Sequence, residues 1–304
     1  MTDTTIPGSK YSLVAHPRFG FLQIKPTPSA EVITQFYEKE FYTSKYPRCN
    51  ASSLKIQLRD KEFYDNSRED ICRNIAELTG KPLKGMEVLD IGCGWGQALL
   101  AFQKRGMICY GFDPAPEGVE YASKKGLNVV RAGMETMDVF GGKRFDVVTL
   151  TDVLEHLSDP VSVLKEIRTR LLKPGGILFI DVPNEFNPFQ VCGQKTHGLD
   201  PWWVAPPGHL NYFTPKTLKK LLRGTGFKVL CAEASFPLEM FLLFGRQYIG
   251  NAKLGRECHQ QRMNFEHNLR EQGYGKLLRK LYRSFAELGI GRKIVMYSRS
   301  ANKR

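Results

Sequence analysis

The feature that most constrains this chain is a short apolar segment that leads directly into three alternating glycines. The segment spans Val88–Gly96. Glycine permits a tight turn and lets a ligand approach the backbone closely, so a strand, a glycine loop and a helix in succession are typical of the nucleotide-binding edge of an α/β sheet. A glycine-rich loop by itself is weak evidence, so its spacing and its neighbours decide which ligand it suits.

The glycine spacing differs from that of a dinucleotide site. Counted from Gly92, the G-x-G-x-x-G/A pattern would end at Gln97, whereas the third glycine stands one residue earlier, at Gly96. A dinucleotide also needs room for its pyrophosphate at the helix N-terminus, and the Asp90 carboxylate just before the loop would repel that group. The same carboxylate suits a ligand with a sulfonium and an ammonium group, such as S-adenosylmethionine (SAM). The spacing therefore argues against an NAD-dependent oxidoreductase.

A second carboxylate, Asp113, ends the next predicted strand. At that point of an α/β sheet, a carboxylate can accept hydrogen bonds from both ribose hydroxyls of a bound nucleoside. Because NAD enzymes share this feature, Asp113 indicates a nucleoside without saying which one.

From Met86 onward, short apolar segments alternate with helical stretches, which predicts β-α-β units and a parallel sheet. We therefore predict an α/β fold with a Rossmann-like, seven-stranded, mostly parallel sheet flanked by helices. Its strands are expected at Glu87–Ile91, Ile108–Phe112, Asn128–Arg131, Phe145–Leu150, Gly176–Val182, Phe227–Ala232 and Lys293–Ser298.

Additions to this core divide the chain into four parts. We expect an N-terminal helical lid or substrate segment over 1–85, the core over 86–232, a basic helical insertion over 233–292, and the last core strand with a tail over 293–304.

Two helices are predicted in the N-terminal part, at Ala30–Phe41 and at about Leu54–Leu78, where Gly80 ends the second. Tyr37 and Tyr42 are candidates to cover the cofactor and contact the substrate. Tyrosines in an amphipathic helix are, however, more often part of the core.

The net charge of +13 is concentrated near the C-terminus, where residues 241–304 hold 14 Lys and Arg against 4 Asp and Glu. Such a region suits an anionic substrate, a nucleic acid or an anionic membrane surface, although solubility of exposed helix faces explains it equally well. An apolar stripe within 277–288 is expected to dock on the core rather than lie on a membrane, and peripheral membrane contact stays open.

Neither a transmembrane segment nor a secretory signal is predicted, because no run of 18 apolar residues exists and the N-terminus is polar. The seven cysteines are scattered and form no C-x-x-C pair, which fits reduced thiols and disfavours a structural zinc site. We expect a cytoplasmic protein without a bound metal, and its oligomeric state stays open.

Together these motifs resemble the class I SAM-dependent methyltransferase family over residues 86 to about 230. Asp90, Gly92, Gly94 and Gly96 match its first motif, and Asp113 matches its ribose-binding acid. The resemblance also implies an adenine contact at Ala132–Glu135, which includes Met134 and Glu135, and matches at Phe145–Val148, Thr151–His156 and Leu171–Gly176.

The loops after the fourth and fifth strands extend this resemblance. Thr151 and Asp152 are expected beside the amino-acid moiety of SAM, unless Asp152 only caps the short helix that follows. The segment Pro207–Phe213 resembles the branch that acts on small molecules, including quinone- and sugar-modifying members. Trp95 in the glycine loop and the long insertion depart from the family pattern, and they affect the substrate prediction more than the cofactor prediction.

Methyl transfer to oxygen or nitrogen can require removal of a proton from the acceptor, and histidine is the usual base near neutral pH. His209 is the first candidate, because it follows the fifth strand at the edge where ligands bind. His156 is the second candidate. Either ring could instead only stabilise its loop.

Three further residues are predicted to contact the acceptor. Asn184 follows the fifth strand, where it would line the acceptor pocket unless it is only a turn residue. Arg246 and Arg262 lie in the basic insertion, together with Arg256, and would bind an anionic acceptor.

We therefore predict methyl transfer from SAM to a small-molecule acceptor, with oxygen favoured over nitrogen and carbon. A sugar or glycan precursor and a quinone-like intermediate both fit. Two alternatives stay open: a nucleic-acid methyltransferase, which the basic C-terminus fits, and a SAM-binding module without catalysis. Against nucleic acid, the segment Thr151–Leu154 lacks the Asn/Asp-Pro-Pro-aromatic motif that holds a base amine.

Overall fold

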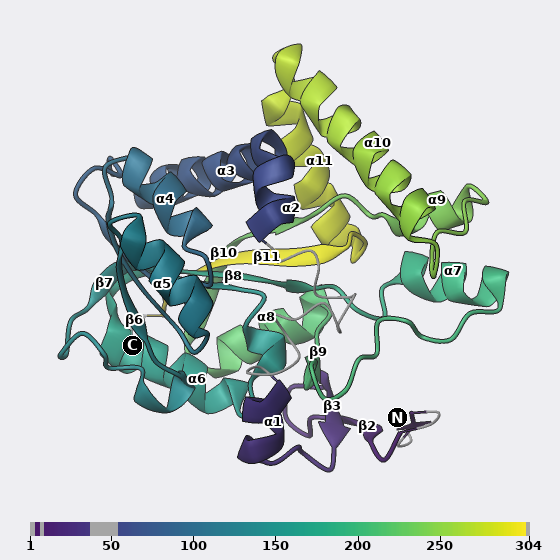
Figure 1. Ribbon diagram of the computed structural model, residues 1–304, viewed down its shortest axis with the longest axis horizontal. Coiled ribbons are helices and arrows are strands. Elements are labelled where there is room, and N and C mark those ends of the chain that lie inside the picture. The colour runs from purple at the N-terminus through teal and green to yellow at the C-terminus, as the bar shows by residue number, and fades with distance from the viewer. Residues whose placement is uncertain (1–3, 7–8, 37–53, 302–304) are drawn as a thin grey trace.

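The computed structural model describes residues 4–6, 9–36 and 54–301. Its largest element is a seven-stranded sheet of order β10-β11-β8-β7-β4-β5-β6 (Figure 1). Neighbours from β8 to β6 are parallel, whereas β11 is antiparallel to both β8 and β10, so the predicted Rossmann-like fold is confirmed. The strands are β4 (Glu87–Ile91), β5 (Ile108–Asp113), β6 (Asn128–Arg131), β7 (Phe145–Thr151), β8 (Leu172–Pro183), β10 (Phe227–Ala234) and β11 (Lys293–Ser300).

Helices cover both faces of this sheet (Figure 1). On one face, Leu164 of α6 belongs to the same buried cluster as Val148 of β7. On the other face, Ile75 of α3 and Leu99 of α4 share a cluster with Val147. Successive residues of a strand point to opposite faces, so the middle of β7 is buried on both sides, while Thr151 at its carboxyl end is exposed. The helices around this sheet include α3 (Lys61–Thr79), α4 (Gln97–Lys104), α5 (Pro116–Lys124), α6 (Pro160–Glu166) and α8 (Pro215–Gly224).

The N-terminal part differs from the predicted helical segment. It begins with β1 (Thr4–Thr5), β2 (Ser12–Ala15) and β3 (Leu22–Lys25), which form a second sheet with β9 (Asn211–Tyr212). Strands this short carry too little alternation to be read from sequence, and β3 is completed by a partner almost 190 residues away.

Helix α1 (Ala30–Phe36) follows this small sheet, and the rest of the predicted first helix, with Tyr37 and Tyr42, lies outside the described residues. The predicted second helix is divided into α2 (Leu54–Arg59) and α3 at Asp60. The Asp60 side chain is buried there and accepts two hydrogen bonds from Arg256, at 2.6 and 2.8 Å, besides those from Arg59. These bonds hold the start of α3 against the insertion.

The insertion is helical, as expected, and contains α9 (Glu239–Leu243), α10 (Ala252–Glu271) and α11 (Gly275–Leu288). Before it, α7 (Pro188–His197) follows β8. No helix in the described part of the chain is long and apolar enough to cross a membrane.

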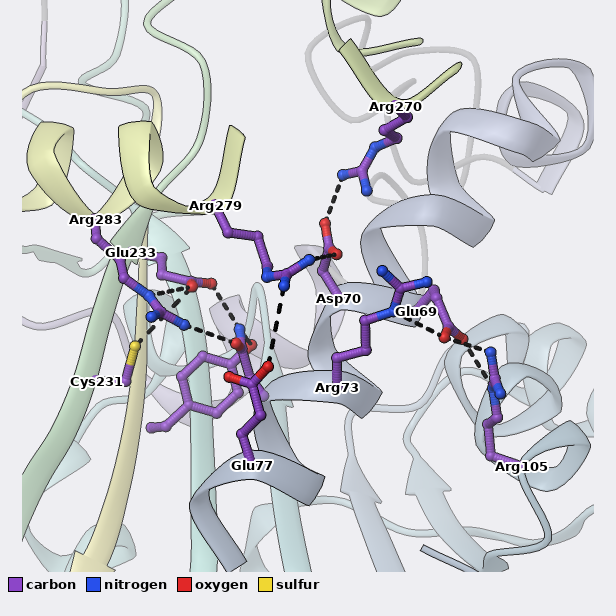
Figure 2. A network of polar contacts seen from close by, with 12 residues as sticks. Glu69, Asp70, Arg73, Glu77, Arg105, Cys231, Glu233, Arg270, Arg279 and Arg283 are labelled. Atoms are coloured by element: carbon purple, nitrogen blue, oxygen red, sulfur yellow. Dashed lines mark hydrogen bonds and ion pairs between the residues drawn. The ribbon is translucent and has the colours of Figure 1, made fainter. Parts of the chain in front are cut away.

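Ion pairs join the insertion to α3 (Figure 2). Asp70 of α3 binds Arg270 of α10 at 2.5 Å and Arg279 of α11 at 3.4 Å. All three side chains are 13 to 15% exposed. Much of the basic charge of the C-terminal region is therefore paired inside the protein rather than presented to a partner.

We expect Asp70→Asn to lower the free energy of unfolding by about 1–3 kcal/mol, because both guanidinium groups lose a charged partner in a mostly buried setting. Urea unfolding measures this loss. Glu77→Gln is the matched control: Glu77 is 57% exposed and stands 4.0 Å from Arg279, so its loss should stay below about 0.5 kcal/mol. Equal losses in the two variants would contradict the structural role of Asp70.

Candidate active site

A cavity with a volume of about 1670 Å³ opens at the carboxyl edge of the parallel sheet. Loops after β4, β5, β7 and β8 line it, together with side chains of α3, α10 and β11. Ligands of open α/β sheets bind at this edge, where the loops from neighbouring strands meet.

The glycine loop has a conformation that only glycine adopts readily. Gly92, Gly94 and Gly96 have φ angles of 72°, 49° and 67°, in the left-handed region that disfavours residues with a Cβ. A Cβ on Gly92 would stand 2.5 Å from Val153, and one on Gly96 would stand 2.6 Å from Leu127. The loop can therefore pack tightly between the turn after β7 and the segment before β6.

Asp113 ends β5 with its carboxylate already held by the backbone. One oxygen accepts a hydrogen bond from the Gly94 N–H and the other from the Ala115 N–H, both at 2.8 Å. The side chain lines the cavity, and Met134 lines it from a 3₁₀ turn (Met134–Thr136) after β6. The Glu135 side chain is not among those described.

Asp90 is buried at the end of β4 and accepts a hydrogen bond from the Thr149 hydroxyl at 2.6 Å. Burial raises the pKa of Asp90 to about 7, against the opposing effect of this hydrogen bond. Its carboxylate is therefore poised between charged and neutral forms near neutral pH, and a nearby cation would favour the charged form.

Asp152, after β7, is strained and doubly held. It has a φ of 53°, which is rare for a residue other than glycine. Its N–H donates to the Asp181 carbonyl at 2.9 Å, and its carboxylate binds Lys293 at 2.8 Å. Lys293 also binds the Asp181 carboxylate at 3.1 Å. Thr151 and Asp152 both line the cavity.

His156 and His209 meet at this cavity, as neighbouring side chains from different loops. Their ring centroids lie 5.0 Å apart. His156 Nδ1 stands 2.6 Å from the Gly208 carbonyl oxygen, and His209 Nδ1 stands 3.2 Å from the Glu185 carboxylate. Glu155 completes the group, with its carboxylate 3.8 Å from His156 Nε2. We call Glu155, His156, Glu185 and His209 the histidine cluster.

The two rings have opposite protonation preferences. Burial and the neighbouring His209 lower the pKa of His156 to about 3. Burial also disfavours the His209 cation, but the Glu185, Glu155 and Asp152 carboxylates outweigh it and raise the pKa of His209 to about 9. At neutral pH the structure thus holds one neutral and one protonated imidazole side by side.

Glu155 is the buried acid of the cluster. Burial, together with Asp152, raises the pKa of Glu155 to about 8. Neither of its carboxylate oxygens has a hydrogen-bond partner among the described residues, although both are buried. An unpartnered buried carboxyl at a cavity wall is costly in a protein without ligand, which points to a group that binds beside it.

A metal ion is one such group. Ligand atoms of Glu155, His156 and His209 lie within 4.8 Å of one another and could hold a cation. The sequence predicted no metal site, because His209 lies 53 and 54 residues after His156 and Glu155, and only the fold brings the three together.

Other predicted acceptor contacts lie elsewhere or have partners. Asn184 is buried outside the cavity lining, and its amide donates to the carbonyls of Gly289 and Gly291; its role is to hold the loop before β11. Arg246 is also outside the lining and binds Gln261 and Glu257. Arg262 does line the cavity, and it donates to Glu266 through Nε at 3.0 Å.

Comparison with known proteins places the chain in a family. The model of a family described as a methyltransferase domain matches residues 63–232, more than half of the chain. The chain therefore belongs to this methyltransferase family, and the predicted class I SAM-dependent methyltransferase is confirmed. The plantazolicin methyltransferase BpumL, solved in complex with S-adenosylhomocysteine (SAH), has the same fold; it is 16% identical, with a TM-score of 0.51 over 89% of this chain and 94% of its own.

Curated relatives include ubiquinone biosynthesis O-methyltransferases of three bacteria. That of Cereibacter sphaeroides is 36% identical over 155 residues, which are 48% of this chain and 61% of the relative. Those of Haemophilus ducreyi and Dinoroseobacter shibae are 34% and 33% identical, over 36% and 52% of this chain and 51% and 68% of theirs. The matched residues thus cover less than two thirds of the first two of these relatives and 68% of the third.

SAM is the cofactor of this family, and the residues present fit it. A Cβ on Gly94 would meet nothing closer than Asp113 at 4.0 Å, so the loop leaves open space beside that carboxylate. Asp90 and Asp152 line the same cavity, and carboxylates suit a ligand that carries a sulfonium and an ammonium group.

We expect NMR titration of the histidine rings to give a midpoint near pH 9 for His209, and a His156 ring that stays neutral down to pH 5. A raised folded-state pKa means that the His209 cation stabilises the fold fully below the ordinary value of about 6.5, and that this contribution is lost as the pH rises through about 9. His156→Gln and His209→Gln assign the signals. An ordinary midpoint for His209 would contradict the ion pair with Glu185.

Proposed function

We propose that this protein transfers the methyl group of SAM to a hydroxyl oxygen of a small molecule, and that a phenolic hydroxyl of a quinone-like precursor fits better than a sugar hydroxyl. One observation carries the proposal: the histidine cluster and the glycine loop line the same cavity. The names of the curated relatives support the acceptor class, since they are O-methyltransferases of ubiquinone biosynthesis.

The cofactor would be held by three carboxylates that line the cavity. Asp113 is suited to the ribose hydroxyls, and Asp90 and Asp152 to the positive charges of the cofactor. SAM supplies an electrophilic methyl group when bound. The further residues proposed to contact it are Gly92, Gly94, Gly96, Met134, Glu135 and Thr151.

The histidine cluster would prepare the acceptor oxygen. The His209 cation beside a hydroxyl favours its deprotonated form, because opposite charges attract in a buried site. Neither Glu155 carboxylate oxygen accepts a hydrogen bond from the described residues, so this group can take the proton as the new carbon–oxygen bond forms. We thus propose that His209 places a positive charge beside the acceptor oxygen. Its sequence position had indicated a base instead.

This division of roles predicts a bell-shaped pH profile of kcat. The rate should rise as Glu155, whose pKa is raised to about 8, ionises, and fall as His209 loses its proton near its pKa of about 9. Assays with catechol and 3,4-dihydroxybenzoate as acceptors measure this. His209→Gln should lower kcat by about 10²- to 10⁴-fold and abolish the alkaline limb, with SAH affinity within threefold of wild type.

His197→Gln is the matched control, because His197 binds the Leu242 carbonyl at 2.9 Å outside the cavity lining. Its kcat should match the wild-type value. The proposed function would be overturned if wild-type protein binds SAH but methylates neither catechol, nor 3,4-dihydroxybenzoate, nor a glucose control. Transfer to glucose but not to catechol would move the acceptor class to sugars.

A divalent cation is a second candidate for what the cluster holds, favoured by the three clustered ligand atoms. His209 would have to release its proton to bind it. The same assays with EDTA, and with added Mg²⁺ or Zn²⁺, separate a metal-dependent reaction from one that uses only the histidine cluster. If the cluster acts without a metal, chelation by EDTA should leave kcat unchanged.

The acceptor is further proposed to carry an anionic group, and Arg262 is the residue that supports this. Its hydrogen bonds within the described structure use only Nε, while the guanidinium lies over the Phe63 ring and beside the cavity. Arg262→Gln should therefore raise the KM for 3,4-dihydroxybenzoate about tenfold and leave the KM for catechol unchanged. Arg246→Gln, outside the lining, is the control.

A further inference from the structure

One short segment connects the histidine cluster to the N-terminal sheet. The Gly208 carbonyl lies at His156, the Leu210 N–H donates to the Glu155 carbonyl at 2.8 Å, and the Phe213 carbonyl accepts from the Glu185 N–H at 3.1 Å. The segment that carries His209 is thus bonded both to the turn after β7 and to the loop after β8.

Asn211 makes the most bonds within this segment. Its side chain is only 1% exposed. The amide nitrogen lies 2.7 Å from the Leu157 carbonyl oxygen, 3.3 Å from that of Leu154 and 3.4 Å from that of Glu155. Those three carbonyls belong to the 3₁₀ turn (Leu154–His156) and the residue after it, so one amide group closes the turn that presents Glu155 and His156.

The orientation of this amide is set by the N-terminal sheet. The Asn211 side-chain oxygen accepts a hydrogen bond from Gln23 of β3 at 3.0 Å. Gln23 and Asn211 are also paired in the register of β3 and β9. With its oxygen occupied by Gln23, the amide must direct its N–H groups at the turn, where only acceptors face it.

We propose that Asn211, oriented by Gln23, is a positioning residue that sets the geometry of the histidine cluster. It stands two residues from His209 and bonds to the turn that holds Glu155 and His156, so it fixes the distance between groups from separate loops. This inference rests on the proposed function, because it assumes that the cluster acts on the acceptor. It also gives the small N-terminal sheet a role in catalysis, through Gln23.

The test uses Asn211→Asp in the full chain. This change keeps the shape of the side chain but replaces a donor with an acceptor that faces three carbonyl oxygens. We expect kcat to fall about 10- to 100-fold, since small displacements of reacting groups have effects of this size. KM for the acceptor and SAH affinity should change less than threefold. The nuclear Overhauser effect (NOE) between the His156 and His209 rings, whose centroids lie 5.0 Å apart, should change in intensity.

Two further variants separate positioning from loss of stability. Gln23→Leu keeps the Asn211 amide but removes the hydrogen bond that orients it, so kcat should fall only a few-fold. Asn74→Asp changes another fully buried asparagine, which donates to Glu233 and Tyr297 in the α3 network. It should lower the melting temperature as Asn211→Asp does while keeping wild-type kcat and the wild-type NOE between the His156 and His209 rings.

An Asn211→Asp protein with lowered melting temperature but wild-type kcat and an unchanged NOE between the two rings would overturn the proposal, since that is the pattern of a structural residue. The NOE needs no turnover. If wild-type protein methylates no acceptor, the proposed function fails while the NOE still reports on positioning. A changed NOE in Asn211→Asp that Asn74→Asp lacks would support the positioning role, and equal changes in both variants would overturn it.

Discussion

The parallel register of β5, β4, β7 and β8 is the constraint on which the functional groups of this protein depend. It brings the ends of four strands to one edge, so that Asp90, Asp113 and Asp152 face one cavity although they are distant in sequence. The left-handed glycine loop donates the Gly94 N–H to Asp113 and leaves open space beside that carboxylate. In the proposed function, cofactor binding and acceptor activation both take place at this edge.

Charge is handled differently at the edge and around it. In the insertion, Arg256 and Arg270 are bound by carboxylates of the N-terminal helices, so their charge holds the molecule together. At the edge, burial leaves Asp90 and Glu155 with raised pKa values, which costs stability unless a ligand compensates. Sites that bind charged ligands commonly hold such perturbed groups, and here they lie at the wall of the cavity.

The cofactor loop and the core strands could be predicted from sequence because their signals are local. These signals are the glycine spacing, an acid at a strand end, and apolar segments long enough to be recognised as strands. The two histidines could be proposed from their places after strands. The Glu185 partner of His209 and the Lys293 partner of Asp152 could not be predicted, because they reach the site only through the order of the strands, and Lys293 is 141 residues from Asp152. Asn184 has the position of a pocket residue, yet its amide is used by backbone carbonyls.

Calorimetric titration of the protein with SAH and with NAD tests the central claim, that this edge is a SAM site, most directly. The account predicts one SAH bound per chain, no heat from NAD, and at least tenfold weaker SAH binding by Asp113→Asn, since a charge-assisted hydrogen bond contributes about 1.5–3 kcal/mol. Binding of NAD, or equal SAH affinity in wild type and Asp113→Asn, would contradict the assignment of this edge as a SAM site.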